Sequence, residues 1–477
     1  MVQKASKPMT QTGEDLRHVF AANLRALLIG RNLSQKDLAE AIGRSPALLS
    51  CWVNGNNLPR ADDLVQLAKF LNCSIDSLFN LQTATDKEVD HEGLKWVESV
   101  PQYVQHMPQP IAQFLEEEIK LGIRLFRTLV IDRISSKDCI DPIDGPFPNQ
   151  SWTSLNRAFR VAVAANALTL TAVPRDEAKE QTLRRLFPSL RQVIVAQLPK
   201  NIYGKYLDNG VIRTEFVALL AATHALTGMP LRSTKVGIGP GYTLMRFAQM
   251  VIPTSTWFAG TEWTPLTVQR FNEDYSYTAN HVTTTLGHRC LGSRALTLPY
   301  IEPERRRPRL GENLQLPADS LRALESVLNL QDLSAIFMSV SGIDHSDLDH
   351  FVFQGDFYSS DGEHVSRLYT QMFSELREQG AADQVVGEML GYMFDAEGRL
   401  LGTPEWRTSY QKILLTIDFN DLIRVASTKY VWLIAAGHNK RKSVLAAVLN
   451  KLANSLVIDS DIAEYLISAR SGKGTPA

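Results

Sequence analysis

Two short helices on either side of a single glycine, within residues 33–79, are the strongest constraint on how this chain folds. Ser34 and Ser45 are each placed to cap a helix, and Pro46 occupies a first-turn position where its missing N–H does no harm. Gly43 supplies the break between the helices. Two short helices joined by a tight glycine-containing turn predict a helix-turn-helix, whose second helix lies in the major groove of duplex DNA.

The same segment, LSQKDLAEAIGRSPALLSCWVNGNNLPRADDLVQLAKFL, resembles the Cro/repressor-type (XRE) helix-turn-helix family. It has counterparts of the family's Leu-Ser-Gln opening, its Leu-Ala-x-x-x-Gly core and the Asn-Gly that follows the recognition helix. The resemblance implies phosphate contacts from Gln35 and Asn54, and base-facing positions on the second helix. With the neighbouring cap and cations, the candidate DNA-binding residues are Gln35, Lys36, Arg44, Ser45, Pro46, Ala47, Ser50, Cys51, Asn54 and Arg60.

The base-facing positions carry no Arg, Lys, Gln or Asn, the side chains that read base edges by paired hydrogen bonds. Apolar contact with thymine methyl groups, DNA shape and phosphate anchoring by Arg31, Lys36, Arg44 and Arg60 would have to supply the specificity. The alternative that this bundle binds a protein instead of DNA stays open.

Composition indicates a globular protein of several domains. The chain has 477 residues, of which 44% are hydrophobic and 21% charged, and its net charge of -1 argues against a surface that binds nucleic acid throughout. The four cysteines form no C-x-x-C pair, so we expect no metal site, and no cofactor is implied. No apolar run reaches the length of a membrane span, and the N-terminus lacks a secretory h-region, so we expect a cytoplasmic protein without a membrane partner.

Beyond Ala167, short apolar runs alternate with helical stretches. The runs span residues 167–173, 191–198, 233–239, 335–342 and 430–437, and the helical stretches include 212–227, 242–251 and 441–453. This alternation predicts an α/β domain around a mainly parallel sheet, with ligands at the carboxyl ends of the strands.

A glycine-rich turn, KVGIGPGYTL (235–244), follows one predicted strand and opens a helix. Its glycines let the backbone approach an anion closely, and the amides of Gly241, Tyr242 and Thr243 would point from a helix N-terminus that favours phosphate. The turn lacks both the Lys-Ser/Thr pair of a P-loop and the spacing of the dinucleotide fingerprint. Taken alone, it is equally consistent with a packing turn.

Three segments beyond this turn resemble, in order and spacing, the effector-binding domain of SorC/DeoR-type sugar-responsive regulators. They are VGEMLGYMFDAEGRLLG (386–402), VWLIAAGHNKRKSVLAAVLN (431–450) and NSLVIDSDIAEYLI (454–467). The resemblance implies a fold of the ribose-5-phosphate isomerase/glucosamine-6-phosphate deaminase-like type. We therefore expect a helix-turn-helix domain over 1–85, a linker and helical segment over 86–180, and an effector-binding domain over 181–477.

The same resemblance implies a phosphorylated sugar as the effector. The candidate effector-binding residues are Gly239, Gly241, Tyr242, Thr243, Glu388 and Lys440, with Lys440 as the cationic partner of the phosphate and Glu388 near the sugar hydroxyls. Tyr242 departs from the residues usual in this loop, which leaves open a different ligand or a vestigial pocket. Lys440 is equally consistent with a solvated basic face, Glu388 with a cap or salt bridge, and Asp459 with a turn rather than a ligand contact.

The middle of the chain resembles the end of the DNA reader that such regulators carry directly before the effector domain. Residues 111–165 would then form a second, degenerate helix-turn-helix with Arg157 and Arg160 on its helix. A helical spacer or dimerisation element is at least as consistent with the pattern.

These observations predict a multidomain transcriptional regulator that senses a small anion and binds a double-stranded operator as a homodimer or homotetramer. No catalytic residues are expected. An enzyme of the related isomerase or deaminase fold is the second reading, and it would need a carboxylate base at the phosphate loop. A DNA-tethered scaffold with a vestigial ligand pocket is the third.

Overall fold

The protein is represented by a computed structural model of the whole chain. It describes residues 17, 20–21, 24–25, 28, 33–71, 87–99, 101, 104, 109–143, 145–201, 203–225, 234–251, 260–267, 278–290, 292–297, 332–342, 372, 374–407 and 416–471. The chain divides into two compact units, residues 1–87 with 98–116 and residues 88–97 with 117–477.

The first unit contains three described helices, α2 (Gln35–Ala41), α3 (Pro46–Val53) and α4 (Ala61–Phe70). Ser34 and Asp37 form a reciprocal capping box at the start of α2, and the Ser45 hydroxyl accepts from the amide of Leu48 at the start of α3. The shared core includes Phe20, Leu24, Leu38, Leu49, Trp52 and Leu67, all fully buried or nearly so. The predicted helix-turn-helix bundle is confirmed.

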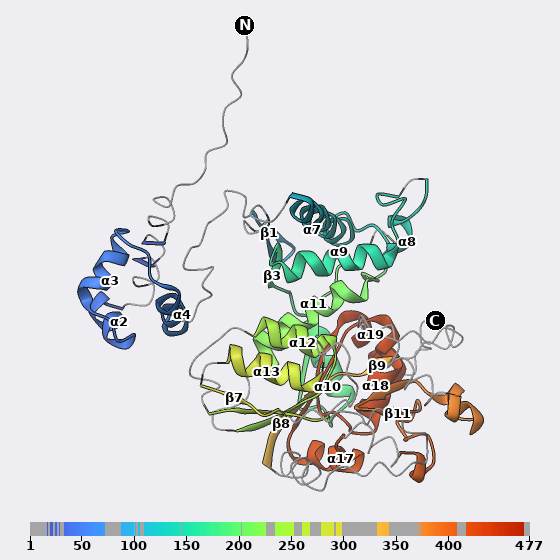
Figure 1. Cartoon of the computed structure of the whole chain (residues 1–477). Helices are drawn as coiled ribbons and strands as arrows, with labels where there is room; N and C mark the ends of the chain where they lie inside the picture. Colours follow the sequence, from blue (N-terminus) through green and yellow to red (C-terminus); the bar gives the residue numbers. More distant parts are fainter. Residues whose placement is uncertain are drawn as a thin grey trace, which may run out of the picture. The chain divides into compact units, whose positions relative to one another are not determined.

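The second unit begins with a small sheet and several helices, and the sequence did not predict the first two strands of this sheet. A hairpin of β1 (Lys87–His91) and β2 (Leu94–Glu98) pairs with β3 (Leu168–Ala172) in a three-stranded sheet of order β1-β2-β3. Helices α7 (Gln109–Val130), α8 (Ser136–Cys139) and α9 (Trp152–Ala164) accompany it. Figure 1 shows α7 and α9 lying close together.

The expectation that residues 167–173 join the parallel sheet was wrong. In β3 buried and exposed residues alternate, with Thr169 and Thr171 exposed. This is the pattern of a strand with one solvent-exposed face, whereas strands of a parallel sheet are buried on both faces.

The main sheet has seven strands in the order β4-β13-β12-β8-β5-β6-β7, and every neighbouring pair in it is parallel. The strands are β4 (Gln192–Ala196), β5 (Lys235–Ile238), β6 (Glu262–Pro265), β7 (Arg294–Ala295), β8 (Leu333–Met338), β12 (Tyr430–Ala435) and β13 (Ser455–Asp459). The predicted combination of a helical N-terminal domain and a parallel α/β domain is confirmed.

Alternate strand residues enter two separate cores, one on each face of the sheet. Ala335 and Phe337 of β8 pack with α11 (Gly210–Leu220), α12 (Tyr242–Met250) and α13 (Ala279–Arg289). Ile336 and Met338 pack on the other face. There they meet α10 (Glu177–Leu186), α17 (Phe419–Thr428), α18 (Arg441–Leu449) and α19 (Ser460–Arg470).

A small antiparallel sheet lies beyond the carboxyl end of β8. It has the order β11-β10-β9 and consists of β9 (Ser341–Gly342), β10 (Gly387–Met389) and β11 (Tyr392–Phe394). The remaining short elements are η1 (Ala221–Ala225), η5 (Ala382–Gln384) and η6 (His438–Lys440). Among the helices that the structure describes, none has the length and apolar character needed to cross a bilayer.

Replacing Gly122 with Ala should lower the thermal midpoint of the second unit. A Cβ at residue 122 of α7 would collide with the carbonyl of Ala158 and lie 2.8 Å from Cα of Phe159 on α9, so two backbones must separate. The expected cost is about 1 to 3 kcal/mol. Gly210→Ala is the control, since a Cβ there meets no atom within 4 Å. Equal midpoints in the two variants would contradict the close packing of α7 on α9.

Candidate DNA-facing surface and candidate effector site

Helix α3 presents its predicted base-facing residues unevenly. Pro46 and Ala47 are exposed, whereas Ser50 and Cys51 are half-buried beside the core residue Trp52. The exposed Asn54 donates from Nδ2 to Ser50 Oγ at 3.2 Å. The surface therefore offers DNA small side chains and few polar groups.

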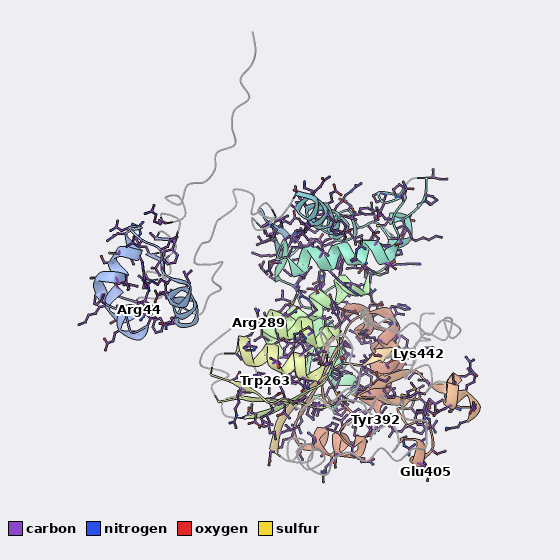
Figure 2. The ribbon with its side chains drawn as sticks, in the orientation of Figure 1. Arg44, Trp263, Arg289, Tyr392, Glu405 and Lys442 are labelled. Atoms are coloured by element: carbon purple, nitrogen blue, oxygen red, sulfur yellow. The ribbon has the colours of Figure 1, made fainter. Side chains whose placement is uncertain are left out.

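The cations around α3 differ in how far they are committed to the protein. Arg44 is labelled in Figure 2, and its Nε lies 2.6 Å from Oδ1 of the buried Asp63 on α4. Gln35, Lys36 and Arg60 are exposed. Arg44 is exposed as well, but its Nε is committed to Asp63, whereas Lys36 and Arg60 extend into solvent. Sequence spacing could not show this, because Asp63 is 19 residues from Arg44.

The glycine turn lies where the order of the parallel strands reverses. From β5 the chain continues to β6 on one side of the sheet, while β8 lies on the other side of β5 and continues to β12. Ligands of open α/β sheets bind at the carboxyl ends of strands at such a switch point. Gly241 has φ 120° and is the N-cap residue of α12, with no side-chain cap.

A second turn of the same backbone form follows β12. Gly437 has φ 110° and ψ 145°, against 120° and 157° for Gly241, and it precedes η6 and α18. Positive φ of this size favours glycine. Since β12 and β5 both pair with β8, the two glycine turns flank the end of β8. A Cβ at Gly241 would lie 2.8 Å from Ser339 Oγ, just beyond β8.

The small sheet joins the other candidate residues to these turns. In β9, Ser341 pairs with Glu388 of β10, and a Cβ at the neighbouring Gly342 would lie 2.9 Å from the amide nitrogen of Lys440. Leu390, at the tip of the β10–β11 hairpin, has a methyl group 3.3 Å from the position of a Cβ on Gly239. The structure therefore gathers the candidate effector residues around the end of β8.

Several of these residues also have structural tasks. An oxygen of Glu388 accepts from the amide of Gly391 and so shapes its own hairpin. Thr243 is buried in the first turn of α12. Lys440 is the N-cap residue of α18, and its amide donates to the Gly437 carbonyl.

The side chain of Tyr242 points from the glycine turn toward the middle segment. Its hydroxyl lies 3.3 Å from Glu215 Oε1, which also accepts from Arg246, and the Arg160 guanidinium of α9 lies 5.1 Å from the ring centroid. Arg157 is paired with Glu118 on α7 at 2.8 Å. Both arginines proposed for a second DNA reader therefore contact protein, which favours the helical-spacer reading of this segment.

A buried ionic cluster fixes the turn after β12. Asp459 accepts from the Gly437 amide at 2.8 Å and caps α19, which confirms that this residue holds a turn. Asp461 contacts Arg213 at 2.8 Å and also pairs with Arg441. Burial opposes the charged carboxylate of Asp461, but hydrogen bonds from His438 and the two arginines outweigh it and hold its pKa well below the usual range. This cluster was not predicted, although the sequence Asp459-Ser460-Asp461 directly after an apolar strand indicates it.

Within the described ranges, no three His, Cys, Asp or Glu side chains could share a metal ion. Of the four cysteines, Cys73 lies outside those ranges, and Cys139 and Cys290 are buried with raised pKa values of about 12, chiefly because of burial.

Two family models match the chain. One is described as "Helix-turn-helix" and matches residues 24–78, and the other is described as "Putative sugar-binding domain" and matches residues 359–468. The chain carries a helix-turn-helix domain and a sugar-binding domain. The first match includes all ten candidate DNA-binding residues. The second includes Glu388 and Lys440, whereas the glycine turn at 239–243 lies outside it.

The chain is also similar to solved transcriptional regulators. The full-length sorbitol operon regulator SorC from Klebsiella pneumoniae is 15% identical, with 74% of this chain and 99% of that chain covered and a TM-score of 0.45. A DeoR family regulator from Listeria monocytogenes is 19% identical, with 61% and 98% covered and a TM-score of 0.44. A regulator from Streptococcus pneumoniae TIGR4 is 16% identical, with 62% and 97% covered and a TM-score of 0.43. No curated protein matches the chain.

Arg44→Ala and Lys36→Ala should separate stability from DNA contact in the helix-turn-helix domain. Arg44→Ala leaves the Asp63 carboxylate buried without its cation and should destabilise the domain by about 1 to 3 kcal/mol, measured by hydrogen exchange of the α3 amides. Lys36→Ala should leave exchange unchanged. On a duplex of any sequence it should lower affinity and reduce the log–log salt slope by about one. An unchanged slope would remove Lys36 from the phosphate contacts.

Asp461→Asn should change how stability depends on pH. Because the folded pKa of Asp461 lies below its ordinary value of 3.8, the carboxylate stabilises the fold above that pH and loses its contribution as the pH falls through the folded pKa. The deficit of the variant in thermal midpoint should therefore be largest near neutral pH and shrink below about pH 4. Asp421→Asn is the control, because that carboxylate pairs with Arg424 on the surface. A deficit that is constant with pH would contradict this role.

Proposed function

We propose that this chain is a ligand-responsive, DNA-binding transcriptional regulator. The observation that carries the proposal is the presence of a helix-turn-helix domain and a sugar-binding domain in one chain. A ligand can act on such a protein only through different affinities for its DNA-binding and non-binding states. Regulation, rather than turnover, is the task of this combination, and the similar solved proteins carry the names of regulators.

The proposed effector is a sugar with an anionic group, in the first place a phosphorylated sugar. Two glycine turns with the same backbone form flank the end of β8, and α12 and the η6–α18 segment begin at them. Backbone amides at a helix N-terminus bind phosphate well. Lys440, which begins α18, would add a point charge, and Glu388 would accept from sugar hydroxyls.

The position of Leu390 supports a second candidate, a DNA-tethered scaffold whose pocket is vestigial. Its side chain is buried and contacts the glycine turn at Gly239. An effector at this turn must share the space above Gly239 with the hairpin tip. A thermal-shift panel of phosphorylated sugars decides between the two, because a protein without a working pocket gains no stability from any of them.

The remaining parts of the proposal concern organisation. We propose a DNA-binding domain over 1–85, a linker and helical segment over 86–180, and an effector domain over 181–477 that relates to the isomerase and deaminase folds. The protein would act in the cytoplasm as a homodimer or homotetramer, since paired readers on a repeated operator raise affinity. Light scattering of the full chain tests the assembly state, and turnover of ribose 5-phosphate or glucosamine 6-phosphate would overturn the assignment as a regulator.

Lys440→Gln should abolish the effector response and keep DNA binding. The loss of one charge-assisted contact to phosphate should weaken the effector at least about tenfold. Lys442→Gln is the matched control, since Lys442 is exposed two residues further along the same segment (Figure 2). The readouts are thermal shift with phosphorylated sugars and fluorescence anisotropy of an operator fragment selected from genomic DNA. Equal effects of the two substitutions would remove Lys440 from the effector site.

A further inference from the structure

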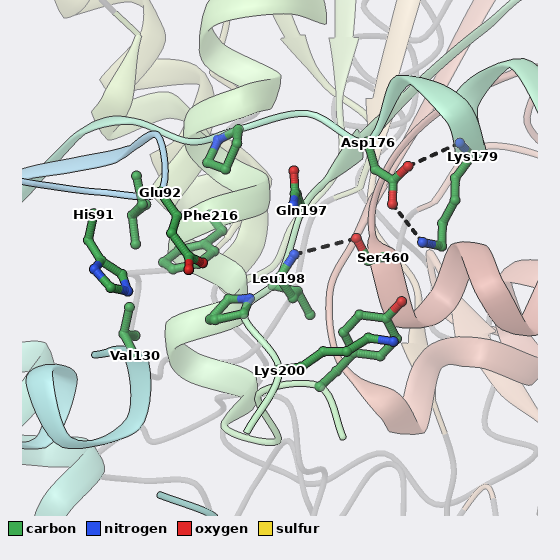
Figure 3. A pocket seen from close by; sticks show the side chains of 14 residues that line it. His91, Glu92, Val130, Asp176, Lys179, Gln197, Leu198, Lys200, Phe216 and Ser460 are labelled. Carbon is green, nitrogen blue, oxygen red and sulfur yellow. Dashed lines mark hydrogen bonds and ion pairs between the residues drawn. The ribbon is translucent and has the colours of Figure 1, made fainter. Parts of the chain in front are cut away.

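A pocket lies at the carboxyl edge of the main sheet, at its β4 end. It has a volume of about 240 Å³ and is formed where β4 and β13 end, at Gln197 and Ser460. The β1–β2 hairpin and α7 close it from the side of the middle segment, through His91, Glu92 and Val130. Figure 3 shows His91 and Glu92 on one side of the pocket and Lys200 and Asp176 on the other. The glycine turns described above do not line it.

The floor of this pocket is apolar and its rim is polar. Leu94, Val130, Leu198 and Phe216 are buried floor residues. Ser460 is buried at the rim, where its hydroxyl donates to the Ala196 carbonyl and accepts from the Leu198 amide. A concave site that combines apolar side chains with a few polar groups is suited to a small polar molecule.

The charged groups of the rim leave one cation uncompensated. Asp176 is paired with Lys179 at 2.6 Å, and Glu92 is paired with Arg133. Lys200 has no carboxylate partner among the described residues, and its Nζ lies 4.6 Å from the centroid of the Tyr206 ring. Among the charged lining residues, Lys200 is therefore the cation that remains available to pair with an anion.

The ring of Tyr206 positions the Lys200 ammonium group, and its neutral hydroxyl does not neutralise that charge. Its hydroxyl donates to Glu464, and burial together with this carboxylate raises the pKa of Tyr206, so the phenol stays neutral. Lys179 lies 5.9 Å from the same ring centroid. Two ammonium groups thus lie near one aromatic ring at the pocket rim.

His91 supplies an observation that is independent of the charges. Its Nε2 is buried and has no hydrogen-bond partner within the described part of the chain, and the side chain lines the pocket. Most buried polar side-chain atoms have a partner, so an unsatisfied one in a cavity wall points to a missing polar group. A ligand oxygen in the pocket would satisfy it.

We propose that this pocket binds a small hydroxylated organic anion, with its acidic group at Lys200 and a hydroxyl at His91. The volume of about 240 Å³ is below the range of drug-sized sites, which favours a ligand smaller than a nucleotide. The site is separate from the effector site proposed above. Because the middle segment and the sheet both line it, an occupant stabilises their packing against each other.

The test is calorimetric titration of the full chain with two anionic probes and one neutral probe. D-gluconate presents a carboxylate, sn-glycerol 3-phosphate presents a phosphate, and D-glucose has no charge. The variants are Lys200→Gln, Lys205→Gln and Lys440→Gln, where the exposed Lys205 lies on the same loop but does not line the pocket. His91→Phe is a second variant, which removes the unsatisfied nitrogen and keeps a ring.

Binding of at least one anion, without binding of D-glucose, is the expected result. Lys200→Gln should weaken it about tenfold or more, and His91→Phe should weaken it too. Lys205→Gln and Lys440→Gln should leave it unchanged. No binding of either anion, or unchanged binding by the Lys200 variant, overturns the proposal. An equal loss of anion binding in the Lys440 variant would assign the binding to the glycine turns and would also overturn the proposal. If only the effector site at the glycine turns fails, this pocket should still bind its anion.

Discussion

The buried carboxylate of Asp459 is the interaction on which the carboxyl edge of the sheet depends. One oxygen caps α19 and the other accepts from the amide of Gly437, so β13, α19 and the turn after β12 share one anchor. Arg213 of α11 lies 3.6 Å from the same carboxylate and brings the opposite face of the sheet to it. A charge buried to this degree is tolerated only because cations and amides surround it. The turn geometry that the proposed effector site needs is therefore set by Asp459 and its buried contacts within the protein.

Periodicity and turn chemistry were enough to predict the two halves of the molecule. Ser45 and Pro46 predict the start of α3, and the apolar runs at 191–198 and 430–437 form the buried strands β4 and β12. The hairpin of β1 and β2 escaped prediction because KEVDH and LKWVE mix charged and apolar residues in strands too short for a clear alternation.

Pairings between distant side chains were the part that sequence could not supply. Arg44 was predicted to contact phosphate and is paired with Asp63, and Arg157 was predicted to lie on a second DNA reader and is paired with Glu118. In each case a basic residue on a helix has two physically reasonable partners, phosphate or a carboxylate of the same protein. The choice depends on which helix packs opposite, and residue type alone does not encode that.

The contact of Arg160 with Tyr242 gives the proposed sensor a physical route into the middle segment. Tyr242 directly follows Gly241. Its ring packs against the Arg160 guanidinium of α9, and its hydroxyl lies near Glu215. A ligand held by the amides of this turn fixes the backbone at residue 242, and so fixes the position of the ring. If α9 holds different positions in the DNA-binding and non-binding states, the contact survives in only one of them. The effector then changes the affinity for DNA through this contact. Thermodynamic linkage requires that DNA change the affinity for the effector by the same factor.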